Sequence, residues 1–143
     1  MKPKGLIGTV GFTCGAFDLL HAGHISMLME AKEQCDYLIA GILGDPTIDR
    51  KNKNKPVQSL PERYIQLESV KYVDKIIPYQ RESDIKEILE LYQPDVRIIG
   101  EEYKGKEFTS KDDCVRLGIE VYFNSRQHDF SSTNLRQRIT NAD

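Results

Sequence analysis

The chain has 143 residues, of which 39% are hydrophobic and 29% charged, and its formal net charge is −2. That length suffices for one hydrophobic core, and the slightly acidic balance excludes a general nucleic-acid-binding surface. No apolar run reaches the roughly 18 residues that a membrane-spanning helix needs, so we expect no membrane span.

Strand-like and helix-like segments alternate along the chain. Short apolar runs that predict buried strands lie at 6–13, 37–43, 75–79, 96–100 and 120–124. Apolar residues at helical spacing or helix-start signals predict helices at 24–35, 61–73, 83–92 and 131–139, with Ser83 as an N-cap. This alternation predicts one α/β, Rossmann-like domain over residues 1–143, with a mostly parallel sheet and helices on both faces.

The cysteines and the N-terminus suggest a location. Cys14, Cys35 and Cys114 are an odd number without a CxxC pair, which argues against a disulfide framework or a zinc site. The basic N-terminus lacks the features of a signal peptide. We therefore expect a cytoplasmic protein.

Three polar stretches follow predicted strands. They are GAFDLLHAGH at 15–24, GEEY at 100–103 and SRQHDFSST at 125–133. Because ligands of open parallel sheets bind at the carboxyl ends of the strands, we expect these stretches to meet at one edge of the sheet.

His21 and His24 lie three residues apart, and three interpretations of the pair are open. A metal site needs a third ligand, for which Asp18 is the only nearby candidate, and the HExxH spacing is absent. The pair can also be an ordinary surface or core pair. A third interpretation is a phosphate site, because the Gly15 turn leads into a helix start whose N–H groups attract anions.

The motifs resemble a known family. GAFDLLHAGH is similar to the GxFDxxHxGH signature of the cytidylyltransferase branch of the nucleotidyltransferase superfamily. SRQHDFSSTNLRQRI resembles that family's second signature, and ERYIQLESVKYVDKIIPY resembles its ERxxxLxxxKYVDxVI segment. In length and pattern the chain most resembles bacterial glycerol-3-phosphate cytidylyltransferases, with ADP-heptose-type nucleotidyltransferases also near.

The resemblance implies roles for individual residues. Catalytic roles fall to His21 and His24 at the α-phosphorus, and to Lys51 and Arg126 at the triphosphate. Lys51 is chosen from a basic loop that also holds Lys53 and Lys55. Nucleotide binding falls to His21, His24, Arg126, Thr13, Cys14, Gly15, Ala16, Phe17, Asp18, Gly100, Glu101, Ser131, Ser132 and Thr133. Acceptor binding falls to Asp45, Lys53, Lys55, Arg63 and Tyr103, although Arg63 can equally have a structural role.

The resemblance also implies a reaction. A small phosphorylated acceptor, such as glycerol 3-phosphate or a related phosphate or phosphonate, attacks the α-phosphorus of CTP, and pyrophosphate leaves. Mg²⁺ enters with the triphosphate and is not held by the protein alone. A homodimer and a role in making cell-surface polysaccharide or lipid precursors are expected. The alternatives are adenylyl transfer from ATP to a phosphorylated sugar, a nucleotide-binding module without turnover, and a metal-dependent hydrolase.

Some residues depart from the family pattern. Ala16 stands where relatives often have threonine, which removes a hydroxyl contact and keeps the backbone donor. Relatives often have GDDW where this chain has Gly100-Glu101-Glu102-Tyr103. These departures bear on which base and which acceptor the chain takes.

Overall fold

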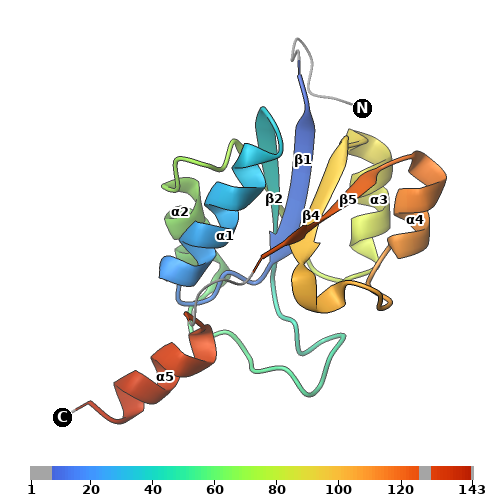
Figure 1. Ribbon diagram of the computed structural model, residues 1–143. Helices are drawn as coiled ribbons and strands as arrows, with labels where there is room; N and C mark the ends of the chain where they lie inside the picture. Colours follow the sequence, from blue (N-terminus) through green and yellow to red (C-terminus); the bar gives the residue numbers. More distant parts are fainter. Residues whose placement is uncertain (1–7, 126–129, 143) are drawn as a thin grey trace.

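The computed structural model describes residues 8–125 and 130–142, in which five parallel strands form one sheet (Figure 1). The strands are β1 (Val10–Gly15), β2 (Tyr37–Leu43), β3 (Lys75–Tyr79), β4 (Val96–Gly100) and β5 (Glu120–Asn124). Their order is β3-β2-β1-β4-β5, and each neighbouring pair is parallel. The expected α/β, Rossmann-like fold is confirmed.

Helices cover both faces of the sheet. They are α1 (Ala22–Glu33), α2 (Leu60–Glu68), α3 (Asp84–Tyr92), α4 (Lys111–Leu117) and α5 (Ser132–Thr140), with a 3₁₀ turn η1 at Glu101–Tyr103. Figure 1 shows α1 and α2 on one face and α3 and α4 on the other. In β2, Leu38 packs in the core on the first side and Ile39 in the core on the second. Because both faces are covered, the strand is apolar throughout.

Four of the predicted strands have the observed bounds, whereas β1 continues to Gly15, two residues beyond its predicted end, and α2 ends at Glu68, five residues before its predicted end. The helix α4 was not expected, because its polar sequence KDDCVRL buries Cys114 alone. Ser83 is the N-cap residue of α3, as predicted, but its side chain makes no capping hydrogen bond. Asp84 Oδ2 instead accepts hydrogen bonds from the backbone N–H groups of Gln80 and Arg81, at 3.2 and 2.9 Å.

The chain order reverses between β1 and β4, which places a ligand-binding crevice at the carboxyl ends of these two strands. This edge is the lower one in Figure 1, where the long loop between β2 and α2 also lies. The helix α5 starts beside this edge and extends away from the layered body, and none of its residues is buried. No helix within the described residues has the length and apolar character needed to cross a membrane.

Candidate active site

The turn between β1 and α1 has a constrained backbone. Phe17 and Leu19 adopt φ values of 53° and 51°, in the left-handed region that residues with a Cβ rarely occupy. The Phe17 ring is buried and lies with its centroid 5.8 Å from that of His24. Strain of this kind is often kept at binding sites, where the surrounding packing maintains it.

The two histidine rings lie beside each other at the start of α1, with their centroids 4.0 Å apart and their planes tilted by 37°. His21 is the N-cap residue, and its Nδ1 accepts a hydrogen bond from the Gly23 N–H at 3.0 Å. His24 Nδ1 accepts a hydrogen bond from the His21 N–H at 3.2 Å. A neutral imidazole that accepts at Nδ1 carries its proton at Nε2. The helix start therefore assigns an Nε2–H donor to each histidine.

Gly23 is required by the position of His21. A Cβ built on Gly23 would lie 2.8 Å from His21 Cε1 and 3.0 Å from Phe130 Cβ. A side chain there would displace the imidazole, because real Cβ contacts are longer than this. The glycine between the two histidines thus allows the His21 ring to fold back over the helix start.

His24 is neutral at ordinary pH. Burial, together with the adjacent His21, lowers the pKa of His24 from 6.5 to about 4, against the opposing charge of Asp18. A neutral imidazole suits hydrogen-bond donation to a phosphate oxygen from Nε2.

Asp18 connects three segments. Its carboxylate accepts hydrogen bonds from the N–H groups of Val57 and Gln58, at 2.8 and 2.9 Å, and pairs with the Arg136 guanidinium of α5 at 2.7 Å. Burial alone would raise the pKa of Asp18, but these hydrogen bonds and the charge of Arg136 hold it below its ordinary value. Asp18 is therefore a charged, fully engaged carboxylate that ties the turn to α2 and α5.

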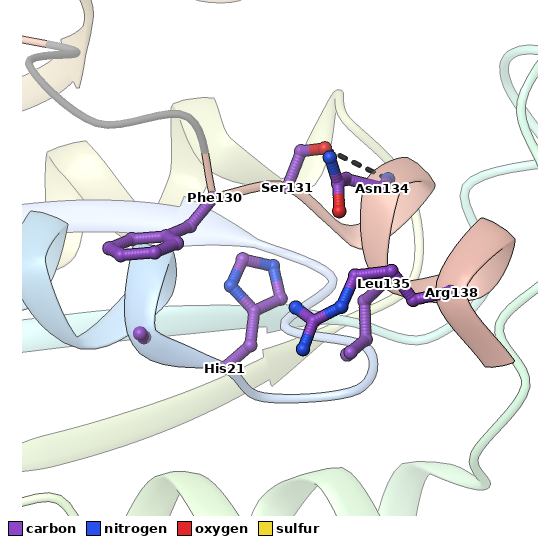
Figure 2. A pocket seen from close by; sticks show the side chains of 7 residues that line it. His21, Phe130, Ser131, Asn134, Leu135 and Arg138 are labelled. Carbon is purple, nitrogen blue, oxygen red and sulfur yellow. Dashed lines mark hydrogen bonds between the residues drawn. The ribbon is translucent and has the colours of Figure 1, made fainter. Parts of the chain in front are cut away.

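The hydroxyl cluster at the start of α5 lies against His21 (Figure 2). Ser131 is the N-cap residue and accepts a hydrogen bond from the Asn134 N–H at 3.0 Å. Ser132 Oγ lies 3.2 Å from His21 Nε2 and donates to the Asp18 carbonyl oxygen at 3.4 Å. Figure 2 also shows the Arg138 guanidinium directed toward His21, across a small pocket of about 130 Å³.

A cleft of about 530 Å³ runs along the carboxyl edge of the sheet. The expected residues that line it are His21, His24, Thr13, Cys14, Gly15, Ala16, Phe17, Asp18, Gly100, Ser131, Ser132, Thr133, Lys53 and Tyr103. The three polar stretches predicted to meet at this edge therefore do so through their described residues. Among the expected residues, Lys51, Lys55, Asp45, Arg63 and Glu101 do not line the cleft. Arg126 lies outside the described residues.

The sequence left two roles open for Arg63, acceptor binding and a structural role, and the structure favours the structural role. Its side chain is 2% exposed. It donates hydrogen bonds to the backbone carbonyl oxygens of Gln58, Ala16, Leu43 and Gly44, at 3.1, 2.9, 2.6 and 2.6 Å. These bonds hold the β1 turn, the end of β2 and the start of α2 together, so the geometry does not support a contact between Arg63 and the acceptor.

The loop after β2 differs from the expectation in detail. Lys51, Lys53 and Lys55 are all exposed, and of these Lys53 lines the cleft. Asp45 is engaged within the loop, because its Oδ1 accepts hydrogen bonds from both the N–H and the hydroxyl of Thr47. This arrangement favours Lys53 over Lys51 as the lysine that approaches a bound phosphate.

The sequence interpretation missed several residues of the cleft. Arg50 lines it and pairs with Glu82 at 2.8 Å, while Arg136 reaches it from α5. Arg97 and Phe108 also line it. Arg50 adjoins the basic loop, which was a weak sequence signal for phosphate binding. Arg97 is a lone arginine inside an apolar strand, and no sequence pattern indicated a role for it.

The histidine pair does not have the form of a metal site. Both Nδ1 atoms accept backbone hydrogen bonds, and the Asp18 carboxylate is directed to Val57, Gln58 and Arg136. Within residues 8–125 and 130–142, no group of three or more His, Cys, Asp or Glu side chains is placed to hold a metal ion.

Helix starts that converge on the switch point of a parallel sheet are typical of α/β enzymes that bind nucleotide phosphates. The chain belongs to the cytidylyltransferase-like family, whose pattern matches residues 12–138. Membership of this family confirms the expected enzyme class, a nucleotidyltransferase of the cytidylyltransferase type.

Individual relatives agree with the family. The chain is 34% identical over 131 residues to the glycerol-3-phosphate cytidylyltransferase of Staphylococcus aureus, covering 92% of this chain and 95% of that protein. It is also 34% identical over 139 residues to the bifunctional protein HldE of Caulobacter vibrioides, covering 96% of this chain and spanning 28% of that protein's length. The solved structure of the lipopolysaccharide core biosynthesis protein from Thermoplasma volcanium superposes with a TM-score of 0.68 at 27% identity, covering 87% and 99% of the two chains.

Proposed function

We propose that the chain transfers CMP from CTP to a small phosphorylated acceptor and releases pyrophosphate. The observation that carries this proposal is the contact of 3.2 Å between His21 Nε2 and Ser132 Oγ. It brings the first and second signature stretches to one point, where two helix N-termini and two imidazole donors face the cleft. The relative in Staphylococcus aureus, which has nearly the same length, supports glycerol 3-phosphate as the first acceptor to test.

The proposed chemistry is an in-line displacement. An ionised phosphate oxygen of the acceptor forms a bond to the α-phosphorus, and the bond from that phosphorus to the β-phosphate bridging oxygen breaks. Because the attacking oxygen is already ionised near neutral pH, the step needs no strong general base. The Nε2–H groups of His21 and His24 donate to the oxygens on which negative charge grows.

The two helix starts supply the ground-state binding in this proposal. Ser131, Ser132 and Thr133 would hold the outer phosphates with backbone N–H groups and hydroxyls. Arg126 remains a proposed triphosphate ligand, and Lys53 is the proposed loop cation that neutralises the departing pyrophosphate. Mg²⁺ would enter bound to CTP, since phosphate oxygens and water can supply most of its ligands.

The experiment is a pyrophosphate-release assay that crosses CTP and ATP with a panel of acceptors. The panel contains glycerol 3-phosphate, sugar phosphates, amino-alcohol phosphates and phosphonates, and glycerol as a phosphate-free control. We expect release with CTP and a phosphorylated acceptor, and none with glycerol. His24→Ala should lower kcat about 100-fold or more while the folded state is kept, as for the loss of one transition-state donor.

Other outcomes would contradict the proposal in distinct ways. Release with ATP and not with CTP would identify an adenylyltransferase. Tight CTP binding without turnover on any acceptor would favour a nucleotide-binding module. Activity that is lost on zinc removal and needs no Mg²⁺ would favour a metal-dependent hydrolase. A homodimer stays a prediction, which analytical ultracentrifugation tests directly.

A further inference from the structure

Arg97 places a cation inside the protein. It lies in the middle of β4, and its side chain is 3% exposed. Its neighbours Val96 and Ile98 pack in the core on the α1 side of the sheet. Because side chains alternate along a strand, Arg97 is directed to the opposite side, beside Cys114 of α4.

The protein compensates this charge poorly. The guanidinium donates hydrogen bonds to the Thr109 carbonyl oxygen, from Nη1, and to the Cys114 thiol, and its central carbon lies 5.2 Å from the centroid of the Phe108 ring. Across residues 8–125 and 130–142, no carboxylate oxygen lies within 4.0 Å of it. An ion that is buried without a partner charge is costly, and proteins keep such groups mainly for function.

Arg63 shows what a structural buried arginine looks like in the same chain. It is as buried as Arg97, at 2% exposed, yet it donates four hydrogen bonds to backbone carbonyl oxygens. It also lies outside the cleft lining, whereas Arg97 is part of that lining. The two arginines therefore differ in how far the backbone satisfies the guanidinium and in whether it reaches the cleft, and these two properties separate a structural arginine from a ligand-binding one.

The part of the cleft around Arg97 is distinct from the triphosphate side. Tyr79, Ile85, Phe108 and Thr109 line it together with Arg97, and these residues belong to β3, α3 and the segment before α4. The histidines and the serine cluster belong to the starts of α1 and α5, and α1 covers the face of the sheet opposite α3 and α4. A second cation in the lining, Arg50, is already paired with Glu82 at 2.8 Å.

We propose that Arg97 binds an anionic group of the acceptor and thereby selects acceptors that carry an oxyanion. The ligand chemistry is a phosphate or carboxylate group, to which a guanidinium can donate two parallel hydrogen bonds. This inference rests on the proposed function, since it assigns the acceptor half of the same cleft. In this proposal Arg97 binds the acceptor in place of Arg63, whose guanidinium donates its hydrogen bonds to backbone carbonyl oxygens.

The test uses Arg97→Met, which keeps the contact with Phe108 and removes the charge. In the pyrophosphate-release assay with CTP, we expect kcat/KM for the acceptor to fall about 100-fold and the KM for CTP to stay unchanged. Glycerol 3-phosphate and 3-phosphoglycerate serve as acceptors. A loss with both assigns Arg97 to the phosphate, and a loss confined to 3-phosphoglycerate assigns it to the carboxylate. Equal losses for CTP and acceptor, or no loss, would overturn the proposal.

A measurement without turnover keeps this inference separate from the proposed function. In the absence of ligands, Arg97→Met should leave the Tm unchanged or raise it, because it removes an uncompensated buried charge. Inorganic phosphate should raise the Tm of the unsubstituted protein more than that of Arg97→Met. Arg116→Met, which removes an exposed arginine of α4, is the matched control and should keep the full response to phosphate.

The outcomes are then distinguishable. A large fall in Tm for Arg97→Met with an unchanged response to phosphate would identify a structural residue and overturn the inference. If no nucleotide and acceptor pair releases pyrophosphate, the proposed function fails, while a phosphate response that depends on Arg97 would still support an oxyanion site at this residue.

Discussion

His21 and Ser132 lie 111 residues apart in the sequence, yet the imidazole Nε2 of one lies 3.2 Å from the hydroxyl oxygen of the other. The Asp18 carbonyl accepts from the same hydroxyl at 3.4 Å, and the Asp18 carboxylate pairs with Arg136 one turn further along α5. Since α5 buries none of its own side chains, these polar contacts are what fixes its N-terminus against the histidines.

Arg136→Met should therefore weaken nucleotide binding without unfolding the chain. The ion pair with Asp18 would be lost, whereas Val57 and Gln58 would still donate to the carboxylate. We expect the KM for CTP to rise about tenfold, equivalent to about 1.4 kcal/mol of binding free energy, with a smaller change in kcat. Limited proteolysis should cut α5 faster than in the unsubstituted protein.

Arg138→Met is the control for that experiment, because it removes a cation from the same helix and leaves the Asp18 pair intact. If both variants raise the KM for CTP equally, general charge near the cleft explains the effect. An unchanged KM in Arg136→Met would show that the ion pair does not position the serine cluster.

Much of the fold and part of the site could be predicted from the sequence. Strands such as β2 are buried on both faces and are therefore apolar throughout, so their pattern reveals them. The motif that holds His21 and His24 is local and was likewise identified. The role of Arg63 could not be predicted, because its four carbonyl partners come from three segments that only the fold brings together. Arg97 was missed for the same reason, since its burial depends on α4, whose sequence has little apolar periodicity.

Arg63→Met should destabilise the folded chain strongly. The substitution leaves four backbone carbonyl oxygens without their hydrogen-bond donors, and burial makes each loss costly. We expect the free energy of unfolding to fall by on the order of 3 kcal/mol or more, measured by urea denaturation. Arg116→Met, on the exposed surface of α4, should change it by less than about 1 kcal/mol. Comparable values for the two variants would contradict a structural role for Arg63.

Gly23→Ala should lower turnover more than stability. The new Cβ would meet the His21 ring at 2.8 Å, so the imidazole must move. We expect kcat to fall about 100-fold, because displacements of about 1 Å at a reacting centre have effects of this size. Alanine favours helix by about 1 kcal/mol over glycine, so the chain should remain folded by circular dichroism. Ser26→Ala introduces the same side chain on the same helix away from the cleft lining, and it should keep full activity.

The half-buried position of His24 should make stability depend on pH below neutrality. In the folded protein the pKa of His24 is about 4, whereas the unfolded chain binds this proton near 6.5. Because the unfolded state binds more protons between these values, the free energy of unfolding should fall as the pH falls from 6.5 to about 4. At about 1.4 kcal/mol per pKa unit, the full effect is on the order of 3 kcal/mol.

His24→Asn should remove this part of the pH dependence, whatever its effect on absolute stability. The comparison is the slope of unfolding free energy against pH, from urea denaturation of both proteins between pH 4 and 7. His21 and Asp18, which also act on the His24 imidazole, remain in both proteins. The pKa of Asp18 is below its ordinary value, so the stability that this carboxylate contributes is lost only at lower pH, when it takes up a proton. NMR titration of the imidazole gives the direct check. A His24 resonance that titrates near 6.5 in the folded protein would contradict the neutral donor on which the proposed mechanism depends.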